Sequence, residues 1–159
     1  MPQDSDRKML RHTLATLAYR AGKTMRGAPA AFAGFRTGEA GRTPGEILAH
    51  MADLMDWALS LAKSKQAWHD SPALEWEAGS ARFFEALKAL DDYLASGEPL
   101  GCPPEKLFQG PVADALTHTG QLAILRRMAG SPMKGENYFQ AEIVEGRVGA
   151  DQAAPRREF

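Results

Sequence analysis

The segment Gly110–Gly130 carries the polar side chains best placed to do chemistry. Within it, Asp114, His118 and Gln121 are spaced by four and then three residues, so on a helix they share one stripe. Apolar residues surround that stripe, and a polar group facing an apolar interior is costly unless a partner satisfies it. A metal ion is the simplest such partner, because two ligands four residues apart on a helix can bind one ion.

A third ligand must come from another helix, and His50 is the best-placed candidate. It lies on the shoulder of the apolar face of a helix expected from Thr43 to about Lys63 or Lys65. Two histidines, one carboxylate and open positions suit Zn²⁺, Ni²⁺ or Fe²⁺. The alternative is that Asp114 and His118 form an ordinary electrostatic pair on a helix and bind no ion.

For the other polar residues near the site, a role at the site is weighed against a structural role. Gln121 either orients His118 or a bound water, or forms a hydrogen bond between helices. Glu46, one turn before His50, is better explained as a capping residue than as a ligand or base. Asp53 is expected to be solvated rather than to orient a ligand, and Asn137 and Tyr138 are candidates for a lid over the site.

Hydrophobic periodicity predicts an all-α protein, because strand-like alternation is nearly absent. Residues 1–132 are expected to form a four-helix up-down bundle, and residues 133–159 an irregular C-terminal tail packed on the same domain. Between the first two helices, Phe32 and Phe35 are expected to pin a Gly- and Ala-rich connection to the core. The predicted helices are Ser5–Met25, Thr43–Lys63, Glu75–Ala95 and Gly110–Gly130.

Helix boundaries are marked by specific residues. Thr43, Pro44 and Glu46 form the pattern of a capping box with proline in the first turn. Pro111 is expected in the first turn of the last helix, and Gly130 at its end. On that helix, Leu125 and Met128 continue the polar stripe, which predicts that the stripe faces inward.

Composition excludes several classes of function. The chain has 159 residues, with nineteen basic and twenty acidic side chains, and no basic patch that would indicate nucleic-acid binding. No apolar run reaches the roughly 20 residues of a membrane span, and no signal peptide is apparent. Cys102 is the single cysteine, which excludes an internal disulfide and favours a reducing compartment. We therefore expect a cytoplasmic protein that binds neither nucleic acid nor membrane, and Cys102 is not expected to act as a nucleophile.

Two segments resemble the DinB-like family of small four-helix metalloproteins. His118–Leu122, with the letters HTGQL, resembles the family's H-R-G-Q-[LI] element on its last bundle helix. Thr43–His50 resembles its second-helix element, a capped start followed by a ligand histidine. Mapped onto this chain, the family's three metal histidines fall on His50, position 114 and His118. Asp114 replaces the usual histidine and Thr119 the usual arginine, and a carboxylate makes the centre less positive than three imidazoles.

The resemblance implies one divalent metal ion held by His50, Asp114 and His118 near one end of the bundle. The family includes thiol-dependent S-transferases and a maleylpyruvate isomerase. The resemblance therefore implies a transferase or isomerase, or a related hydrolase, acting on a small molecule. The metal would lower the pKa of a bound water or thiol, and a low-molecular-weight thiol is the expected partner, in a homodimer. The alternative is a non-catalytic helical dimer or small-ligand-binding protein in which Asp114 and His118 form a structural pair.

Overall fold

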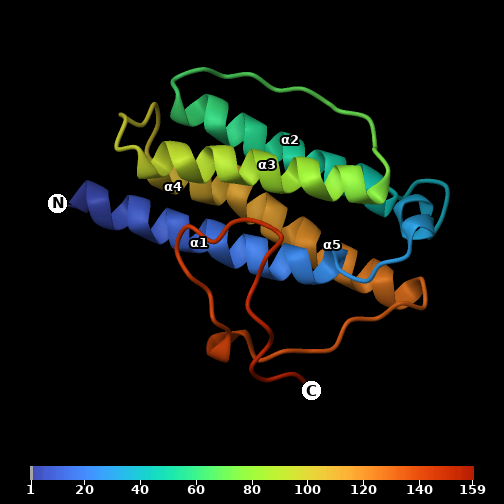
Figure 1. Ribbon diagram of the computed structural model, residues 1–159. Coiled ribbons are helices and arrows are strands. Elements are labelled where there is room, and N and C mark those ends of the chain that lie inside the picture. Colours follow the sequence, from blue (N-terminus) through green and yellow to red (C-terminus); the bar gives the residue numbers. More distant parts are fainter. Residues whose placement is uncertain (1) are drawn as a thin grey trace.

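Long helices pack side by side along most of the chain (Figure 1). The computed structural model describes residues 2–159, with side chains from Ser5 onward. Across this range no strand is present, and the predicted all-α bundle of four long helices is confirmed. The long helices are α1 (Pro2–Met25), α2 (Pro44–Ala62), α3 (Trp76–Ala95) and a continuous run of α4 (Pro104–Leu107), η2 (Phe108–Val112) and α5 (Ala113–Met128). Short 3₁₀ turns form η1 (Ala30–Gly34) and η3 (Tyr138–Gln140).

The helix directions differ from the expected up-down alternation at one connection. Residues 63–75 travel back along α2, so α3 starts beside the beginning of α2 and the two helices are parallel (Figure 1). The Ala67 amide donates to the Ser60 hydroxyl at 3.2 Å, and the Ser71 amide donates to the Asp53 carboxylate at 2.8 Å. An extended connection of this length reaches about 40 Å, further than the ~28 Å of α2, so a parallel pair is sterically possible.

The four helices surround one apolar core. Both α1 and α2 pack against α3 on one side and α5 on the other, which makes α2 and α5 neighbours. Phe32 in η1 is buried, and its ring centroid lies 5.1 Å from that of Trp76. The expectation that this phenylalanine pins the first connection to the core is confirmed. Large side chains with almost no exposed surface include Leu14, Leu17, Met51, Met55, Phe83, Leu87 and Leu122.

The last long helix begins earlier than predicted. Pro104, not Pro111, occupies its first turn, and Pro111 lies inside a π-helical turn, η2. An internal proline lacks an N–H group and its ring clashes with the carbonyl four residues earlier, and a widened turn relieves both problems. The turn also brings Leu107 and Val112, five residues apart, to the same buried face, whereas α-helical spacing would separate them by about 140°.

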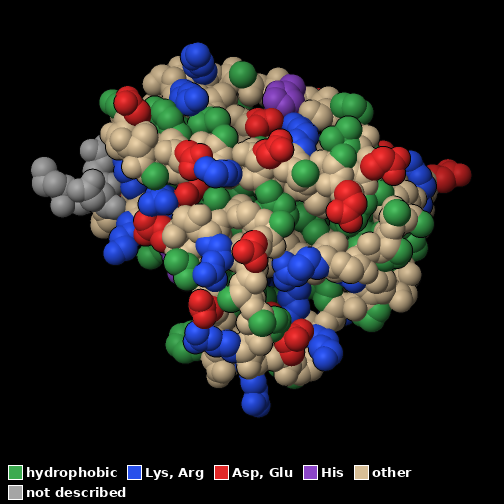
Figure 2. Space-filling model, viewed as in Figure 1, with side chains coloured by type: hydrophobic (Ala, Val, Ile, Leu, Met, Phe, Trp, Pro, Cys, Tyr) green, Lys and Arg blue, Asp and Glu red, His purple; other side chains and the backbone are tan. Residues whose placement is uncertain are grey.

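The C-terminal residues pack along α1. The buried Lys23 ammonium donates to Glu136 at 2.6 Å, and the Arg11 guanidinium donates to Glu145 at 2.6 Å. Val148 is buried in the core. On the face shown in Figure 2, basic and acidic side chains are intermixed. None of the helices in residues 2–159 combines the length and apolar character needed to cross a membrane.

Candidate metal centre

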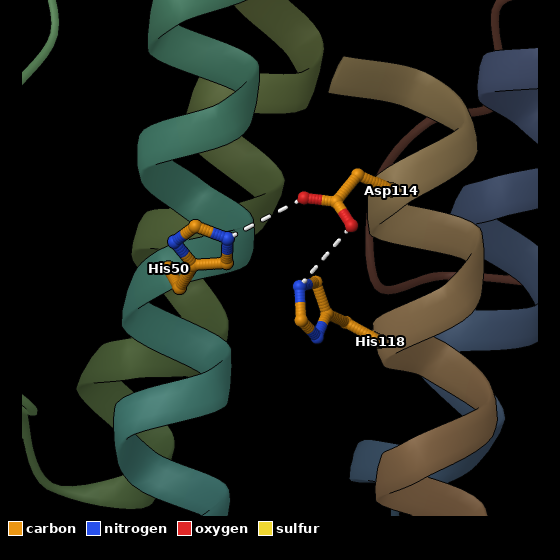
Figure 3. Close-up of side chains that lie close together, drawn as sticks. All are labelled: His50, Asp114 and His118. Atoms are coloured by element: carbon orange, nitrogen blue, oxygen red, sulfur yellow. Dashed lines mark ion pairs between the residues drawn. The ribbon is translucent and has the colours of Figure 1, made fainter. Parts of the chain in front are cut away.

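The start of α2 sets the position of His50. The Thr43 hydroxyl accepts from the Glu46 amide at 3.2 Å, and the Glu46 carboxylate accepts from the Thr43 amide at 2.8 Å. This is the predicted capping box, so Glu46 acts as a capping residue. With the first turn held in this way, His50 lies one turn further on and faces α5 (Figure 3).

His50, Asp114 and His118 converge in the groove between α2 and α5. Figure 3 shows His50 pointing from α2 toward the Asp114 and His118 side chains of α5. The Asp114 carboxylate presents one oxygen to each ring, with Oδ2 3.5 Å from His50 Nε2 and Oδ1 3.4 Å from His118 Nε2. The two rings meet edge to face with centroids 4.8 Å apart. The convergence of side chains from two helices is therefore present in the folded chain.

The three side chains lie close enough together that they could hold one metal ion. One atom from each residue can be chosen so that all lie within 4.8 Å of one another. Two ligands about 2.1 Å from a tetrahedral ion are about 3.4 Å apart, and each imidazole lies 3.4 or 3.5 Å from a different oxygen of the Asp114 carboxylate. These separations are long for direct hydrogen bonds. Spacing and donor chemistry both fit a divalent ion.

The site is partly open, because the Asp114 side chain is 46% exposed and those of His50 and His118 are 19% and 12% exposed.

The site lies part-way along the bundle, not near one end as expected, because the last helical run starts at Pro104, well before Asp114. The stripe predicted to face inward follows a groove and reaches the surface at Met128, which is 57% exposed. The prediction that the stripe faces inward was therefore wrong at Met128, although Leu125 on the same stripe is buried.

Gln121 determines which nitrogen of His118 faces the other ligands. The Gln121 Oε1 atom lies 2.7 Å from His118 Nδ1. An amide oxygen can only accept, so this bond requires the proton on Nδ1 and leaves Nε2 of the neutral ring with a lone pair. Nε2 is the atom that approaches Asp114. The bond is of the kind that orients a metal-bound histidine, the first of the two roles considered for Gln121.

We expect Gln121→Leu to lower the affinity for Zn²⁺ about 10- to 100-fold, the effect typical of losing a hydrogen bond to a ligand. Competition with a chromogenic chelator measures this affinity. Gln121→Glu is the matched control, because its carboxylate still accepts from His118 Nδ1 and should keep the affinity within a few-fold of the wild type. Unchanged affinity in Gln121→Leu would show that this bond does not support metal binding.

Two tryptophans cover the His50 side of the groove. The Trp68 ring packs edge to face against His50, with centroids 5.6 Å apart, and against Trp57 at 5.9 Å. Burial lowers the pKa of His50, the charges of His118 and Arg42 lower it further, and Asp114 only partly opposes these effects. A lowered pKa keeps the imidazole neutral near pH 7, which is the form that binds metals.

A cavity lies on each side of the three side chains. One, of about 430 Å³, is lined by His118 and Gln121 together with Arg42 and Ile47. The other, of about 410 Å³, is lined by Asp114 with Trp57, Leu54, Gln109, Gly110, Ala113 and Thr117. Trp57 therefore contributes to a cavity wall as well as to packing. Open space therefore flanks the three side chains on both sides.

A second histidine–carboxylate cluster links α2 to the following connection and to α3. His69 Nε2 is 3.1 Å from Asp53 and 3.2 Å from Asp56, so these atoms also meet the spacing of a metal site. Here, however, the Arg82 guanidinium already donates to both carboxylates, at 2.5 and 3.1 Å. Its positive charge takes the place of a cation, so this cluster is an ion-pair network.

Asp53 is buried, with a side chain 2% exposed, and the expectation that it is solvated was wrong. The connection between α2 and α3 folds back over it, and Ser71 donates to it through its amide and hydroxyl. Burial raises the pKa of Asp53, but the bonds from Ser71 and Arg82 outweigh burial and place it below the ordinary value of 3.8. The carboxylate holds the connection that carries Trp68.

We expect Asp53→Asn to lower the free energy of unfolding at pH 7 by about 2–4 kcal/mol, because it weakens a buried, charge-assisted network. Since the pKa is lowered by folding, the ionised group stabilises the protein fully above 3.8 and loses this effect as pH falls below it. Urea unfolding at pH 7 and pH 3 should therefore show a difference that shrinks in acid. Asp92→Asn, in an exposed pair with Lys88, should change stability by less than about 0.5 kcal/mol.

The candidate lid residues lie elsewhere. Tyr138 packs edge to face against Tyr19 and beneath the Arg20 guanidinium, 4.1 Å from its ring centroid, and Asn137 caps η3. Both are on the α1 side of α5, whereas His50 approaches α5 from α2, so the lid prediction was wrong.

Burial and the charge of Glu105 raise the pKa of Cys102, which keeps this thiol protonated.

Sequence reasoning missed three residues near the candidate site and the Asp53 cluster, namely Arg42, Trp68 and Arg82. All three depend on segments folding against distant helices, so no local spacing marks them. No protein-family model, curated protein or solved structure gives a significant match to the chain. The DinB-like assignment remains a prediction that rests on the residues Thr43–His50 and His118–Leu122.

Proposed function

We propose that this protein is a metal-dependent enzyme of the DinB-like kind, with one divalent ion held by His50, Asp114 and His118. The observation that carries the proposal is the approach of two imidazole nitrogens and one carboxylate, at 3.4 and 3.5 Å, in a groove flanked by cavities. A structural Asp–His pair would need neither a second histidine from α2 nor open space on both sides.

The ligand set favours a catalytic over a purely structural ion. Two neutral imidazoles and one carboxylate leave a divalent centre with a net positive charge, and three protein ligands leave at least one position open. Structural zinc sites usually have four protein ligands and are closed. Zn²⁺, Ni²⁺ and Fe²⁺ all accept this donor set.

The residues around the ligands have separable roles. A bound ion would supply Lewis-acid chemistry that lowers the pKa of a water or thiol beside it. Gln121 holds the proton of His118 on Nδ1, Asp114 reduces the positive charge of the centre, and Trp57 and Trp68 shield His50 from water. We propose that the reaction is thiol transfer to, or isomerisation of, a small electrophile, with hydrolysis as the related alternative.

The test combines metal content with turnover. Elemental analysis of the purified protein should give about one divalent ion per chain, as expected for a single three-ligand site. Thiol consumption, or conversion of the electrophile followed by chromatography, should then be detectable with a panel of small electrophiles, should disappear on treatment with a chelator and should return on adding metal. Protein that contains no metal and takes up none would overturn the proposal. Stoichiometric metal without turnover for any thiol, electrophile or ester would instead favour a non-catalytic metal carrier.

We also propose that the protein is a homodimer, as the family resemblance implies. Support comes from Met9 and Phe108, which are exposed apolar side chains lining a cavity of about 390 Å³ between α1 and α4. Exposed apolar patches of this kind often mark contact surfaces. Light scattering distinguishes a dimer from the 17.3 kDa monomer.

A further inference from the structure

The cavity next to His118 is lined by an exposed cation, Arg42, which forms no hydrogen bond or ion pair with the side chains described from Ser5 onward. Its polar lining comes from Thr37, Arg42, His118 and Gln121. Its apolar wall is made by Ile47, Ile124 and Leu125. The cavity thus combines one positive charge with an apolar surface, immediately beside the proposed metal ligands.

Arg42 differs from its neighbour Arg36 because none of the described side chains binds it directly. The Arg36 guanidinium donates to the Gly41 carbonyl at 3.4 Å and lies 4.0 Å from the Glu46 carboxylate. Among the residues whose side chains are described, Arg42 forms no hydrogen bond and no ion pair. An acidic group that senses its charge is the Glu46 carboxylate at the start of α2, whose pKa Arg42 helps to lower without forming an ion pair with it.

The loop that carries Arg42 has a defined shape. Arg36 contacts its Gly41 carbonyl, and Thr43 at its end caps α2. A Cβ atom on Gly41 would lie 3.1 Å from the Thr37 hydroxyl, so the Thr37 side chain is packed closely against the loop. Arg42 therefore projects from an ordered segment held at both sides.

Gln121 adds a second donor to this cavity. Its amide oxygen is used by His118 Nδ1, which leaves its NH₂ group as a donor. An arginine and an amide NH₂ are both donors without acceptor capacity. They match a carboxylate or phosphate group, which accepts several hydrogen bonds and binds arginine in a bidentate manner.

We infer that this cavity binds the anionic group of a small organic molecule, a carboxylate or a phosphate ester, through Arg42. The apolar wall receives the body of that molecule. This places a substrate anion on the His118 side of the centre and leaves the Trp57 side for the second reactant. The identification of the bound anion as substrate rests on the proposed function, whereas the anion site itself does not.

Calorimetric titration with three probes that share one ring tests the inference: benzoate, phenyl phosphate and benzyl alcohol. At least one of the two anions should bind at least about tenfold more tightly than the uncharged alcohol, the difference expected for a charge-assisted bond. The tighter anion identifies the headgroup. Equal binding of all three probes, or no saturable binding of either anion, would overturn the inference.

Variants connect the binding to one residue. Arg42→Gln should weaken anion binding at least about tenfold while its thermal unfolding stays that of the wild type. Arg127→Gln removes the same charge from an exposed position on α5 outside the cavity, and should bind the anions as the wild type does. Equal loss in both variants would show a general charge effect and would overturn a site at Arg42.

Measuring metal in the same samples separates the two proposals. If the wild type binds no metal but binds the anions through Arg42, the proposed function fails and the anion site stands. If metal is bound and Arg42→Gln changes no anion affinity, the anion site fails and the metal centre stands. Chelator-treated protein should retain most of the Arg42-dependent binding, because a direct bond to an ion would not require this arginine.

Discussion

Purified His118→Ala protein is expected to contain no stoichiometric metal. The change removes one of the three ligand atoms and leaves Asp114 and His50, which come from different helices and are 3.5 Å apart. The affinity for Zn²⁺ should fall by more than about 100-fold, beyond the loss that follows from removing a hydrogen bond to a ligand. His50→Ala should have the same effect, because it removes the one ligand that α2 contributes. Elemental analysis and chelator competition both measure the loss.

The second histidine cluster provides the control for this experiment. His69→Ala also removes a histidine near two carboxylates, Asp53 and Asp56, where Arg82 supplies the positive charge. It should leave the metal content unchanged. Metal retained in both His50→Ala and His118→Ala would eliminate the proposed ligands. Metal lost in His69→Ala, with the other two variants still loaded, would move the site to the Asp53 cluster.

Glu136→Ala is expected to give the largest loss of stability, about 3–5 kcal/mol in the free energy of unfolding. The Glu136 side chain is fully buried, and it accepts from the Lys23 ammonium at 2.6 Å and from the Tyr19 hydroxyl. Removing it leaves Lys23, itself 8% exposed, with Glu158 as its remaining acidic partner at 3.2 Å. A buried charge that loses its main partner is costly. Urea unfolding measures the change.

A double variant distinguishes the cost of an unpaired buried charge from the cost of lost packing. Lys23→Met combined with Glu136→Leu replaces both charged groups by apolar side chains of similar size, and should recover most of the lost stability. Glu142→Ala, which breaks exposed pairs with Arg147 and Arg156 in the same tail, should change stability by less than about 1 kcal/mol. A double variant as unstable as Glu136→Ala would show that packing, not an unpaired charge, is responsible.

Local features of the fold were predictable from short-range chemistry. The capping box at Thr43 and Glu46 is formed as predicted, and α2 and α3 end within a residue or two of their expected limits. Pairing of side chains three and four residues apart placed Asp114, His118 and Gln121 along one stripe. The contact of Gln121 with His118 follows from that spacing. These features depend only on neighbours within one helical turn.

The π turn at Phe108–Val112 was harder to predict, although a signal is present. A proline at position 111 normally marks the beginning of a helix, and Pro104 offered an equally good beginning. The apolar residues Leu107 and Val112 are five residues apart. Side chains on one face of an α-helix are three or four residues apart, so this spacing does not fit an α-helix. Only the packing of both side chains in one core selects the widened turn, and this selection also sets the direction in which Asp114 points.

The amino-acid sequence by itself determined the presence of four long helices, the capping box of α2 and the order of the polar side chains along α5, because each of these depends on residues one or two turns apart. The tertiary structure decided the parallel course of α2 and α3, the burial of Asp53, the position of Trp68 over His50 and the placement of Arg42 in a cavity. Those features depend on where long connections pass over distant helices. The path of a connection is selected by burial and ion pairing across the whole bundle, so no local pattern specifies it.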